Sequence, residues 1–179
     1  MTNIETQRLV LTPFSSADFS RFVGEMLTDR RVVEFYYSYR DLDDVDQIRE
    51  KAEADFWDHF EESKTEHNLH IWAAYTAIDG ASFVGWCGLL HTDLSDKFGG
   101  PELQYMIAGD SHGEGFATEL ASPVVQHAST EKLAKSITAT VDIPNIGSIR
   151  VLEKLGFELS GQIEAYGSEE MYLYRKDLT

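Results

Sequence analysis

Cysteine, proline and basic residues are scarce in this chain of 179 residues. It has one cysteine and four prolines, and its 15 lysines and arginines stand against 31 aspartates and glutamates. A lone cysteine excludes an internal disulfide, and the apolar neighbours of Cys87 in FVGWCGLL favour a buried, inert thiol. No run of about 18 apolar residues is present to span a bilayer, and the N-terminus MTNIETQRLVLTPF lacks the segments of a signal peptide. We therefore expect a soluble, cytoplasmic protein.

The shortage of basic residues gives a formal net charge of -16. Such a charge repels nucleic-acid phosphates and anionic lipids, and it attracts cations. We therefore expect no nucleic-acid or membrane partner, and a cationic partner is favoured. The length and the 42% of hydrophobic residues are typical of one folded domain, and no repeat, low-complexity tract or proline-rich linker divides residues 1–179.

Hydrophobic periodicity predicts the order β-α-α-β-β-β-α-β-α-β-β. The strands are expected at residues 8–14, 69–78, 82–92, 101–108, 135–142, 157–166 and 169–178, and the helices at 15–27, 41–63, about 116–129 and 145–157. Ser15 or Ser16 would cap the first helix, Asp79-Gly80 would turn a hairpin, and Gly156 would close the last helix. A mixed sheet flanked by helices buries the apolar faces of these elements, so the expected class is α/β (α+β).

The segment GDSHGEGFATELASPVVQHAS, residues 109–129, changes from a glycine-rich half to an amphipathic half. If a helix begins near Gly115, the N–H groups from Gly113 to Ala117 have no helical acceptor, and they form an anion site. The alternative is a plain strand-to-helix turn in which the glycines only relieve strain. A P-loop would need Gly-Lys-Ser/Thr, and a dinucleotide-binding turn would need glycine in place of Thr118.

Two stretches, PELQYMIAGDSHGEGFATELASPVV and NIGSIRVLEKLGFEL, resemble the GNAT family of N-acetyltransferases, especially the ribosomal-protein alanine N-acetyltransferase branch. The opening IETQRLVLTPFSSADF is similar too, so the resemblance covers nearly the whole chain. It implies a mostly antiparallel sheet and transfer of an acetyl group from acetyl-CoA to a primary amine in a ternary complex, without a metal. The leading acceptor is a protein or peptide N-terminal α-amine. A polyamine or other small amine is the alternative, and a non-catalytic acetyl-CoA-binding module is another.

The resemblance also implies the residues that bind the co-substrate. The pantetheine chain would lie between the strand before the loop and the next strand, and the loop would bind the diphosphate. The implied contacts are Tyr105, Met106, Ile107, His112, Gly113, Glu114, Gly115, Phe116, Ala117, Thr118 and Asn145. The family pattern has arginine or glutamine where this sequence has Asp110, and an acidic side chain there would repel a diphosphate unless it points away.

An amine that is protonated at neutral pH must lose a proton before it attacks a thioester. Glu102 is the expected base, and a solvated strand-end carboxylate is the alternative reading; Gln104 would face the same side and orient the acceptor. The tyrosine that many family members use to protonate the thiolate is replaced by Leu152. The resemblance therefore implies Ser148, although a serine in a first helical turn also bonds backbone.

Other residues complete the expected site. Tyr36 and Tyr37, in EFYYSYR, would line the acceptor pocket or cover the edge of the core. The acidic run from Asp41 to Glu62 is interpreted as a solvated face rather than a binding site. The histidines are scattered, and HNLH lacks neighbouring ligands in a metal-binding pattern, so no metal site is expected. A monomer or a homodimer fits this sequence.

Overall fold

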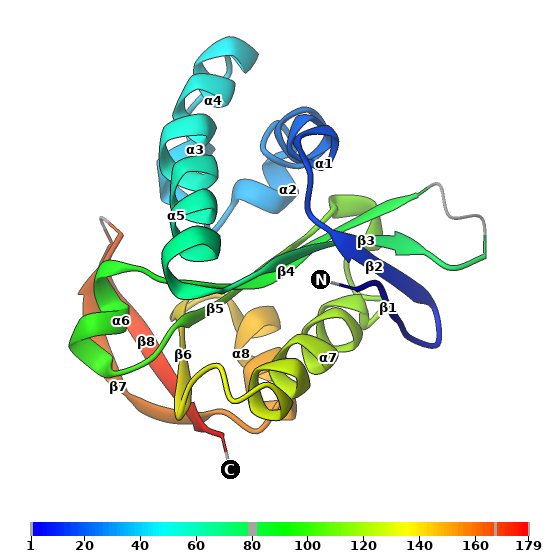
Figure 1. Cartoon of the computed structure of the whole chain (residues 1–179). Helices are drawn as coiled ribbons and strands as arrows, with labels where there is room; N and C mark the ends of the chain where they lie inside the picture. The colour runs from blue at the N-terminus through cyan, green and yellow to red at the C-terminus, as the bar shows by residue number, and fades with distance from the viewer. Residues whose placement is uncertain (1, 79–81, 167, 179) are drawn as a thin grey trace.

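The computed structural model describes residues 2–78, 82–166 and 168–178, except the side chains of Tyr37, Asp58, Ser168 and Glu169. One eight-stranded sheet runs through it in the order β1-β2-β3-β4-β5-β6-β8-β7 (Figure 1). The strands are β1 Ile4–Glu5, β2 Leu9–Pro13, β3 Ile71–Thr76, β4 Phe83–Leu90, β5 Glu102–Ile107, β6 Ser136–Asp142, β7 Glu158–Ala165 and β8 Ser168–Asp177. Neighbouring strands are antiparallel except β5 and β6, which are parallel.

Helices cover both faces of this sheet. The N-terminal helices lie on one face, and α7 and α8 lie on the other (Figure 1). The N-terminal group is α1 Ser16–Arg21, η1 Phe22–Met26, α2 Arg30–Val33, α3 Tyr37–Arg40, α4 Val45–Ala52, η2 Glu53–Trp57 and α5 Asp58–His67, and the later elements are α6 Asp93–Phe98, η3 Gly109–Ser111, α7 Phe116–Thr130 and α8 Ile146–Lys154. No helix of the described residues is long and apolar enough to cross a membrane.

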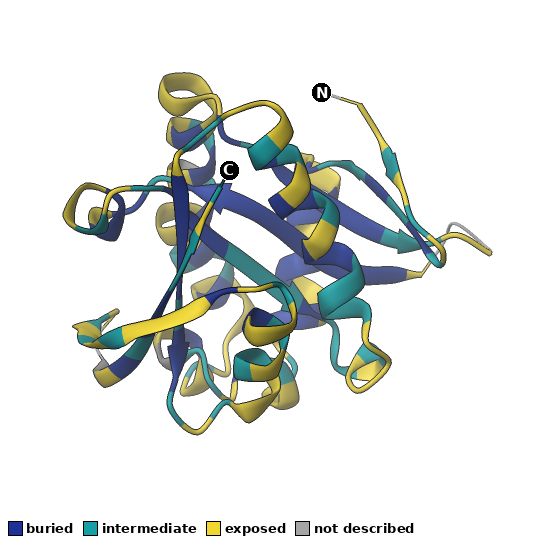
Figure 2. Cartoon of the chain, turned by 90° about the horizontal axis from the view of Figure 1, so that it is seen from below, coloured by how far each residue is buried: buried dark blue, intermediate teal, exposed yellow. Residues whose placement is uncertain are grey.

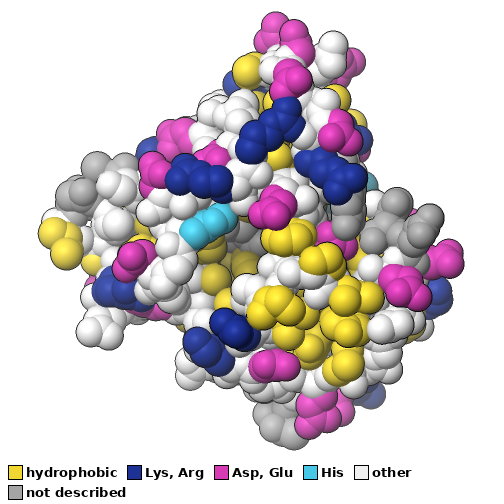
Figure 3. Space-filling view, turned by 180° about the vertical axis from the view of Figure 1, so that it is seen from behind, with side chains coloured by type: hydrophobic (Ala, Val, Ile, Leu, Met, Phe, Trp, Pro, Cys, Tyr) yellow, Lys and Arg dark blue, Asp and Glu magenta, His cyan; other side chains and the backbone are white. Residues whose placement is uncertain are grey.

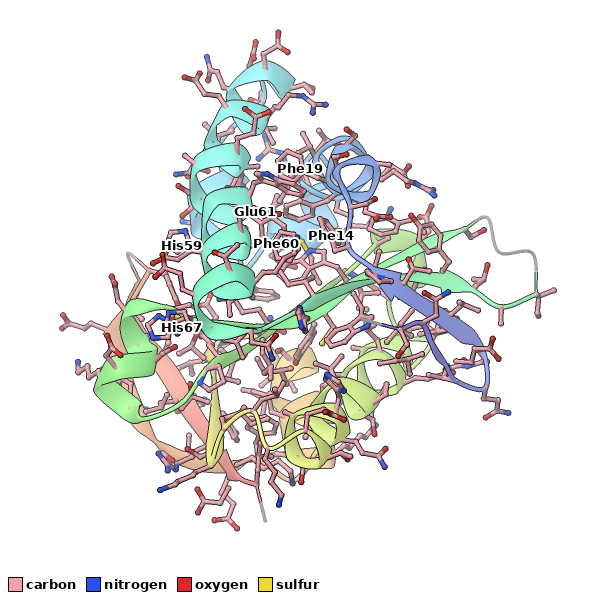
Figure 4. The ribbon with its side chains drawn as sticks, viewed as in Figure 1. Phe14, Phe19, His59, Phe60, Glu61 and His67 are labelled. Atoms are coloured by element: carbon pink, nitrogen blue, oxygen red, sulfur yellow. The ribbon has the colours of Figure 1, made fainter. Side chains whose placement is uncertain are left out.

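Two hydrophobic cores hold these layers together. One lies between the sheet and the pair α7 and α8, and includes Leu120, Val124 and Leu152. The other lies under the N-terminal helices, where Phe14 packs 6.0 Å from Phe60 between ring centroids. Figure 4 shows Phe14, Phe19 and Phe60 in the space between α5 and α1. Every residue of β4 is buried because this central strand is covered on both faces, whereas the edge strand β7 is largely exposed (Figure 2).

The fold agrees with the predicted class, a mostly antiparallel sheet flanked by helices. Ser15 caps α1 in a capping box with Asp18, and Gly156 follows α8 with a φ of 79°, as expected. The second predicted helix is displaced, since α4, η2 and α5 run from Val45 to His67. The strand β1 and the short helices α2, α3 and α6 were not predicted. The Asp79-Gly80 turn lies outside the described residues.

The sheet opens between β5 and β6. These strands share one register pair, Glu102 with Thr138, and the Thr138 N–H donates to the Pro101 carbonyl at 3.0 Å. The strand β6 pairs with β8 along its whole length, whereas beyond Glu102 the described residues that pair with β5 belong to β4 alone. The two strands therefore part after their first residues, and backbone groups in the second half of β5 face the opening.

Candidate active site

Glu102 lies at the closed end of this opening. Its residue is 1% exposed, so the interpretation as a solvated strand-end carboxylate is wrong. The carboxylate accepts hydrogen bonds from Thr140 Oγ1 at 2.6 Å and from Thr92 Oγ1 at 3.3 Å. The Tyr166 hydroxyl and Gln104 Nε2 also donate to it, the latter at 3.2 Å. A buried carboxylate needs such donors because burial removes its water.

Strand alternation on β5 sorts the remaining predicted residues to two faces. Gln104 lies beside Glu102, as expected, and Met106 packs toward the core under the N-terminal helices. Tyr105 and Ile107 pack into the other core. The strand therefore brings Glu102 and Gln104 to the side of the N-terminal helices.

Tyr36 approaches Glu102 from the connection between α2 and α3. Burial raises the pKa of Tyr36 to about 12, and the negative charges of Asp55 and Glu102 add to the effect. Its ring is parallel to that of Tyr39, with centroids 5.0 Å apart. Tyr36 thus lies near the candidate base and also packs on the core edge. The side chain of Tyr37 is outside the described part of the chain.

Tyr105 and Ser148 meet on the opposite face of the opening. The Tyr105 hydroxyl lies 2.7 Å from Ser148 Oγ, and either group can donate. Asn145 caps α8, as predicted, because its side chain accepts from the Ser148 N–H at 3.0 Å. Burial raises the pKa of Tyr105, so its phenol keeps its proton at neutral pH. Leu152 is 1% exposed and belongs to the core.

The glycine-rich loop joins β5 to α7. Gly113 and Gly115 have φ values of 82° and 80°, in the left-handed region that glycine tolerates best. The Glu119 N–H donates to the Gly115 carbonyl at 3.2 Å, which starts the α7 ladder and leaves the preceding N–H groups without a helical acceptor. His112 is folded back, with Nε2 2.8 Å from the Ile107 carbonyl oxygen. The residues from His112 to Gly115 are exposed, so a ligand can reach these amides.

Asp110 points into solvent and pairs with a residue from the N-terminal helices. Its side chain is 91% exposed, and its Oδ1 lies 2.8 Å from Arg31 Nη2. Arg31 also contacts Asp29 at 2.6 Å. A Cβ on Gly109 would lie 2.3 Å from Asp29 Oδ2, so a larger residue there would displace the side chains of this ion pair. The sequence patterns had not indicated Arg31, because the contact joins positions 79 apart in the chain.

The side of the molecule that faces away from the viewer in Figure 1 is hollowed near its middle. Figure 3 shows histidine, lysine and arginine side chains on one side of the hollow and a hydrophobic patch on the other.

No group of three histidine, cysteine, aspartate or glutamate side chains within the described ranges could hold a metal ion. In HNLH, His67 instead stacks on His91, with ring centroids 3.7 Å apart at the foot of α5 (Figure 4).

A sheet opened beside a glycine-rich helix start defines the class of the N-acetyltransferases. The family model described as acetyltransferase (GNAT) domain matches residues 8–158, so the chain belongs to the GNAT family. It is therefore an acetyl-CoA-dependent N-acetyltransferase.

Relatives and solved structures agree with this assignment. The chain is similar to the uncharacterized protein YkkB of Bacillus subtilis, with 26% identity over 98% of this chain and 96% of that protein. A putative GNAT-family acetyltransferase from Bordetella pertussis has a TM-score of 0.77, with 21% identity over 98% of this chain and 99% of that one.

Two further structures share the fold and differ in their named acceptors. Spermidine N-acetyltransferase from Vibrio cholerae, in complex with CoA and spermine, has a TM-score of 0.71 and 16% identity over 97% of both chains. A ribosomal-protein alanine acetyltransferase from Vibrio fischeri has a TM-score of 0.73 and 15% identity, over 99% of this chain and 97% of that one.

Proposed function

We propose that the protein acetylates the α-amino group of a protein or peptide by direct attack on acetyl-CoA in a ternary complex. The observation that carries the proposal is the buried Glu102 at the closed end of the β5 and β6 opening, on the side of Gln104 and Tyr36. The similarity in sequence pattern to the ribosomal-protein alanine N-acetyltransferase branch, and the shared fold of one such enzyme, support this acceptor class.

The residues present fit acetyl-CoA. The loop offers exposed amides at a helix start, where a diphosphate is stabilised, and the glycines leave room for a close approach. The unpaired edge of β5 beside the opening offers backbone groups to an extended chain such as pantetheine. The diphosphate would be held by Gly113 to Thr118. The pantetheine would be lined by Tyr105, Met106 and Ile107, with His112 and Asn145 at the two ends of the pantetheine. Bound there, acetyl-CoA supplies the acetyl group as an activated thioester.

The chain's own groups divide the proton transfers. Glu102 takes the proton of the acceptor amine, while Gln104 and Tyr36 position that amine. Ser148, whose oxygen is held against the Tyr105 hydroxyl, donates a proton to the departing thiolate. Asn145 fixes the first turn of α8, which sets the position of Ser148.

Polyamine acetylation is the second candidate. The net charge of -16 favours a polycation, and a spermidine acetyltransferase shares the fold. A cytoplasmic location and a monomeric or homodimeric state are part of the proposal.

Release of free CoA thiol should be measured with alanine-starting and serine-starting peptides, spermidine and spermine. We expect turnover with peptides, and blocking the peptide α-amine should abolish it. Faster turnover with spermidine than with every peptide would select the second candidate. Binding of acetyl-CoA without turnover on any amine would select the non-catalytic module.

A further inference from the structure

We propose that Tyr166 relays the proton of the acceptor amine to Glu102. This inference rests on the proposed function and identifies the group through which its base acts. Tyr166 lies in the turn between β7 and β8, 64 positions from Glu102 in the chain, and its hydroxyl donates to Glu102 Oε2.

Burial argues against direct contact between Glu102 and the amine. The residue is 1% exposed, and four donors surround its carboxylate, about as many as the lone-pair sites of a carboxylate. An ammonium group would have to displace one of them. Thr92 is itself 9% exposed, whereas Tyr166 is 51% exposed and reaches from the surface to the carboxylate.

Backbone conformation supports a specific position for this phenol. Tyr166 has a φ of 51°, a left-handed conformation that is uncommon for residues other than glycine. The β7 and β8 pairing shifts register just before the turn, between Ile163 and Ala165. The turn therefore aims the Tyr166 hydroxyl inward at a conformational cost.

Chemistry favours the phenol over the other donors. A phenol is more acidic than the alkyl hydroxyl of Thr140, and an amide such as Gln104 is a poor proton carrier. Burial raises the pKa of Tyr166, and the Glu102 charge raises it further, so the phenol stays protonated at neutral pH. It can therefore accept one proton only by passing its own proton on.

The relay balances in one concerted step. The Tyr166 oxygen accepts a proton from the ammonium as the phenol O–H bond breaks, and that phenol proton moves to Glu102 Oε2. The products are a neutral amine with its lone pair free to attack, a neutral tyrosine and a protonated Glu102.

The charged and titratable neighbours come from several elements. Tyr36, from the connection between α2 and α3, interacts electrostatically with both Glu102 and Tyr166. Asp55 of η2 acts on Tyr36, and Asp142 is buried on the same face of β6 as Thr140. His91, next to Thr92, is engaged with His67 and Asp96. Among the titratable groups named here, Tyr166 is the one with a described hydrogen bond to the Glu102 carboxylate.

The test compares Y166F, E102Q and the double variant across pH with an acceptor that the wild type uses. We expect Y166F to bind acetyl-CoA normally and to lose about 10- to 100-fold in kcat near neutral pH, because an acid-base group is removed. The loss should shrink as pH rises and the amine deprotonates by itself. The double variant should match E102Q, since the two residues act in one path.

Two further variants and a spectroscopic measurement complete the design. Y75F removes the comparable bond between Tyr75 and Asp18 outside the site and should keep the wild-type pH profile. A 3-fluorotyrosine at position 166 nearly keeps the shape, makes the phenol more acidic by lowering its pKa, and should shift the pH profile even if Y166F folds poorly. The ¹³C signal of the Glu102 carboxyl, identified by its loss in E102Q, should move in Y166F without any substrate.

Several results would overturn the relay. Among them are a Y166F variant with a raised KM and a wild-type pH profile, multiplicative losses in the double variant, and a T140V variant that alone reproduces the E102Q profile. A wild type that binds acetyl-CoA but acetylates no amine would instead overturn the proposed function.

Discussion

At the scale of single residues, Glu102 is the proposed proton acceptor, and its side chain is buried. Replacing it by glutamine keeps the shape and removes the proton acceptor. We expect E102Q to lower turnover by about 100-fold near neutral pH, with a smaller loss at high pH where more acceptor amine is neutral. A pH series of kcat with acetyl-CoA saturating would measure this.

The matched control for this prediction is D18N. Asp18 is also a buried carboxylate that accepts from a tyrosine, Tyr75, but it belongs to the capping box of α1. D18N should lower stability and leave the pH dependence of kcat unchanged. An E102Q profile parallel to the wild type would remove Glu102 as the base.

Arg31 modifies the charge beside the glycine-rich loop. It pairs with Asp110, which occupies the place of the arginine or glutamine in the family pattern, and we expect it to offset the repulsion from Asp110. R31Q should weaken CoA binding about twofold to fivefold, and D110N should strengthen it, because both groups are exposed and solvent screens the pair. The effect of R31Q should be smaller in a D110N background; equal effects in both backgrounds would mean that the pair plays no part in binding.

Gly115 tests the placement of the diphosphate. Among the described residues, a Cβ there would meet only Arg8 Nη2, at 3.8 Å, so a side chain finds room within the protein but occupies the space in front of the loop amides. Its φ of 80° also penalises a branched residue. G115V should therefore lower CoA affinity by more than about tenfold, measured by calorimetry, since the amides lose their alignment. G24V, at a glycine with open space in η1, is the control, and normal affinity in G115V would contradict this placement.

At the scale of elements, hydrophobic patterns predicted the long elements and missed the short ones. The helix α7 and the strands β4 and β6 carry long hydrophobic patterns, and they lie where the sequence predicts. The helices α2, α3 and α6 have four to six residues, too few for a 3.6-residue period to repeat. The capping box at Thr92 was the available signal for α6.

The same limit applies to the candidate site. Glu102 and Gln104 were predicted to share a face because strand alternation is local. Tyr166, Thr140 and Arg31 reach the site from distant positions, and no local pattern reveals such contacts. The role of Ser148 was inferred from a family pattern, and its contact with Tyr105 depends on how α8 packs beside β5.

The attachment of α7 to the connection between β1 and β2 depends on Glu119. Its carboxylate accepts from Thr6 Oγ1 and from the Arg8 backbone N–H, each at 2.7 Å, and it pairs with the Arg8 guanidinium. Burial opposes ionisation, but these hydrogen bonds and the Arg8 charge outweigh it and lower the pKa of Glu119. A lowered pKa stabilises the fold above about pH 4.5, and this contribution is lost as pH falls through the folded-state value.

E119Q should therefore lower the free energy of unfolding by about 1–2 kcal/mol at pH 7. The difference from the wild type should shrink as pH falls and vanish only below the lowered folded-state pKa of Glu119, where both side chains are uncharged. Urea unfolding at several pH values would measure it, with E131Q, at an exposed residue just after α7, as control. A constant difference across the whole pH range would assign the effect to packing rather than to charge.

At the scale of the whole molecule, the net charge of -16 acts oppositely on the two substrates. Acetyl-CoA is a polyanion and must approach against this field, whereas an ammonium acceptor is drawn by it. In the proposed complex, the loop amides, Arg31 and the opening in the sheet would offset the repulsion at short range, where hydrogen bonds form. Salt screens the long-range field more than these short contacts, so the balance depends on ionic strength.

We therefore expect salt to have opposite effects on the two Michaelis constants. Between about 50 and 500 mM NaCl the Debye length shrinks roughly threefold. Screening of the attraction should raise the KM for spermidine and so lower its kcat/KM. Screening of the repulsion should lower the KM for acetyl-CoA. A peptide acceptor with a single positive charge should show a shallower fall in kcat/KM than spermidine. Steady-state kinetics at constant pH, with sucrose in place of salt as the control for water activity, would measure these slopes. Equal slopes for the two acceptors would show that the acidic surface does not steer the amine, and the acceptor preference would then have to come from contacts with Gln104, Tyr36 and Tyr166 alone.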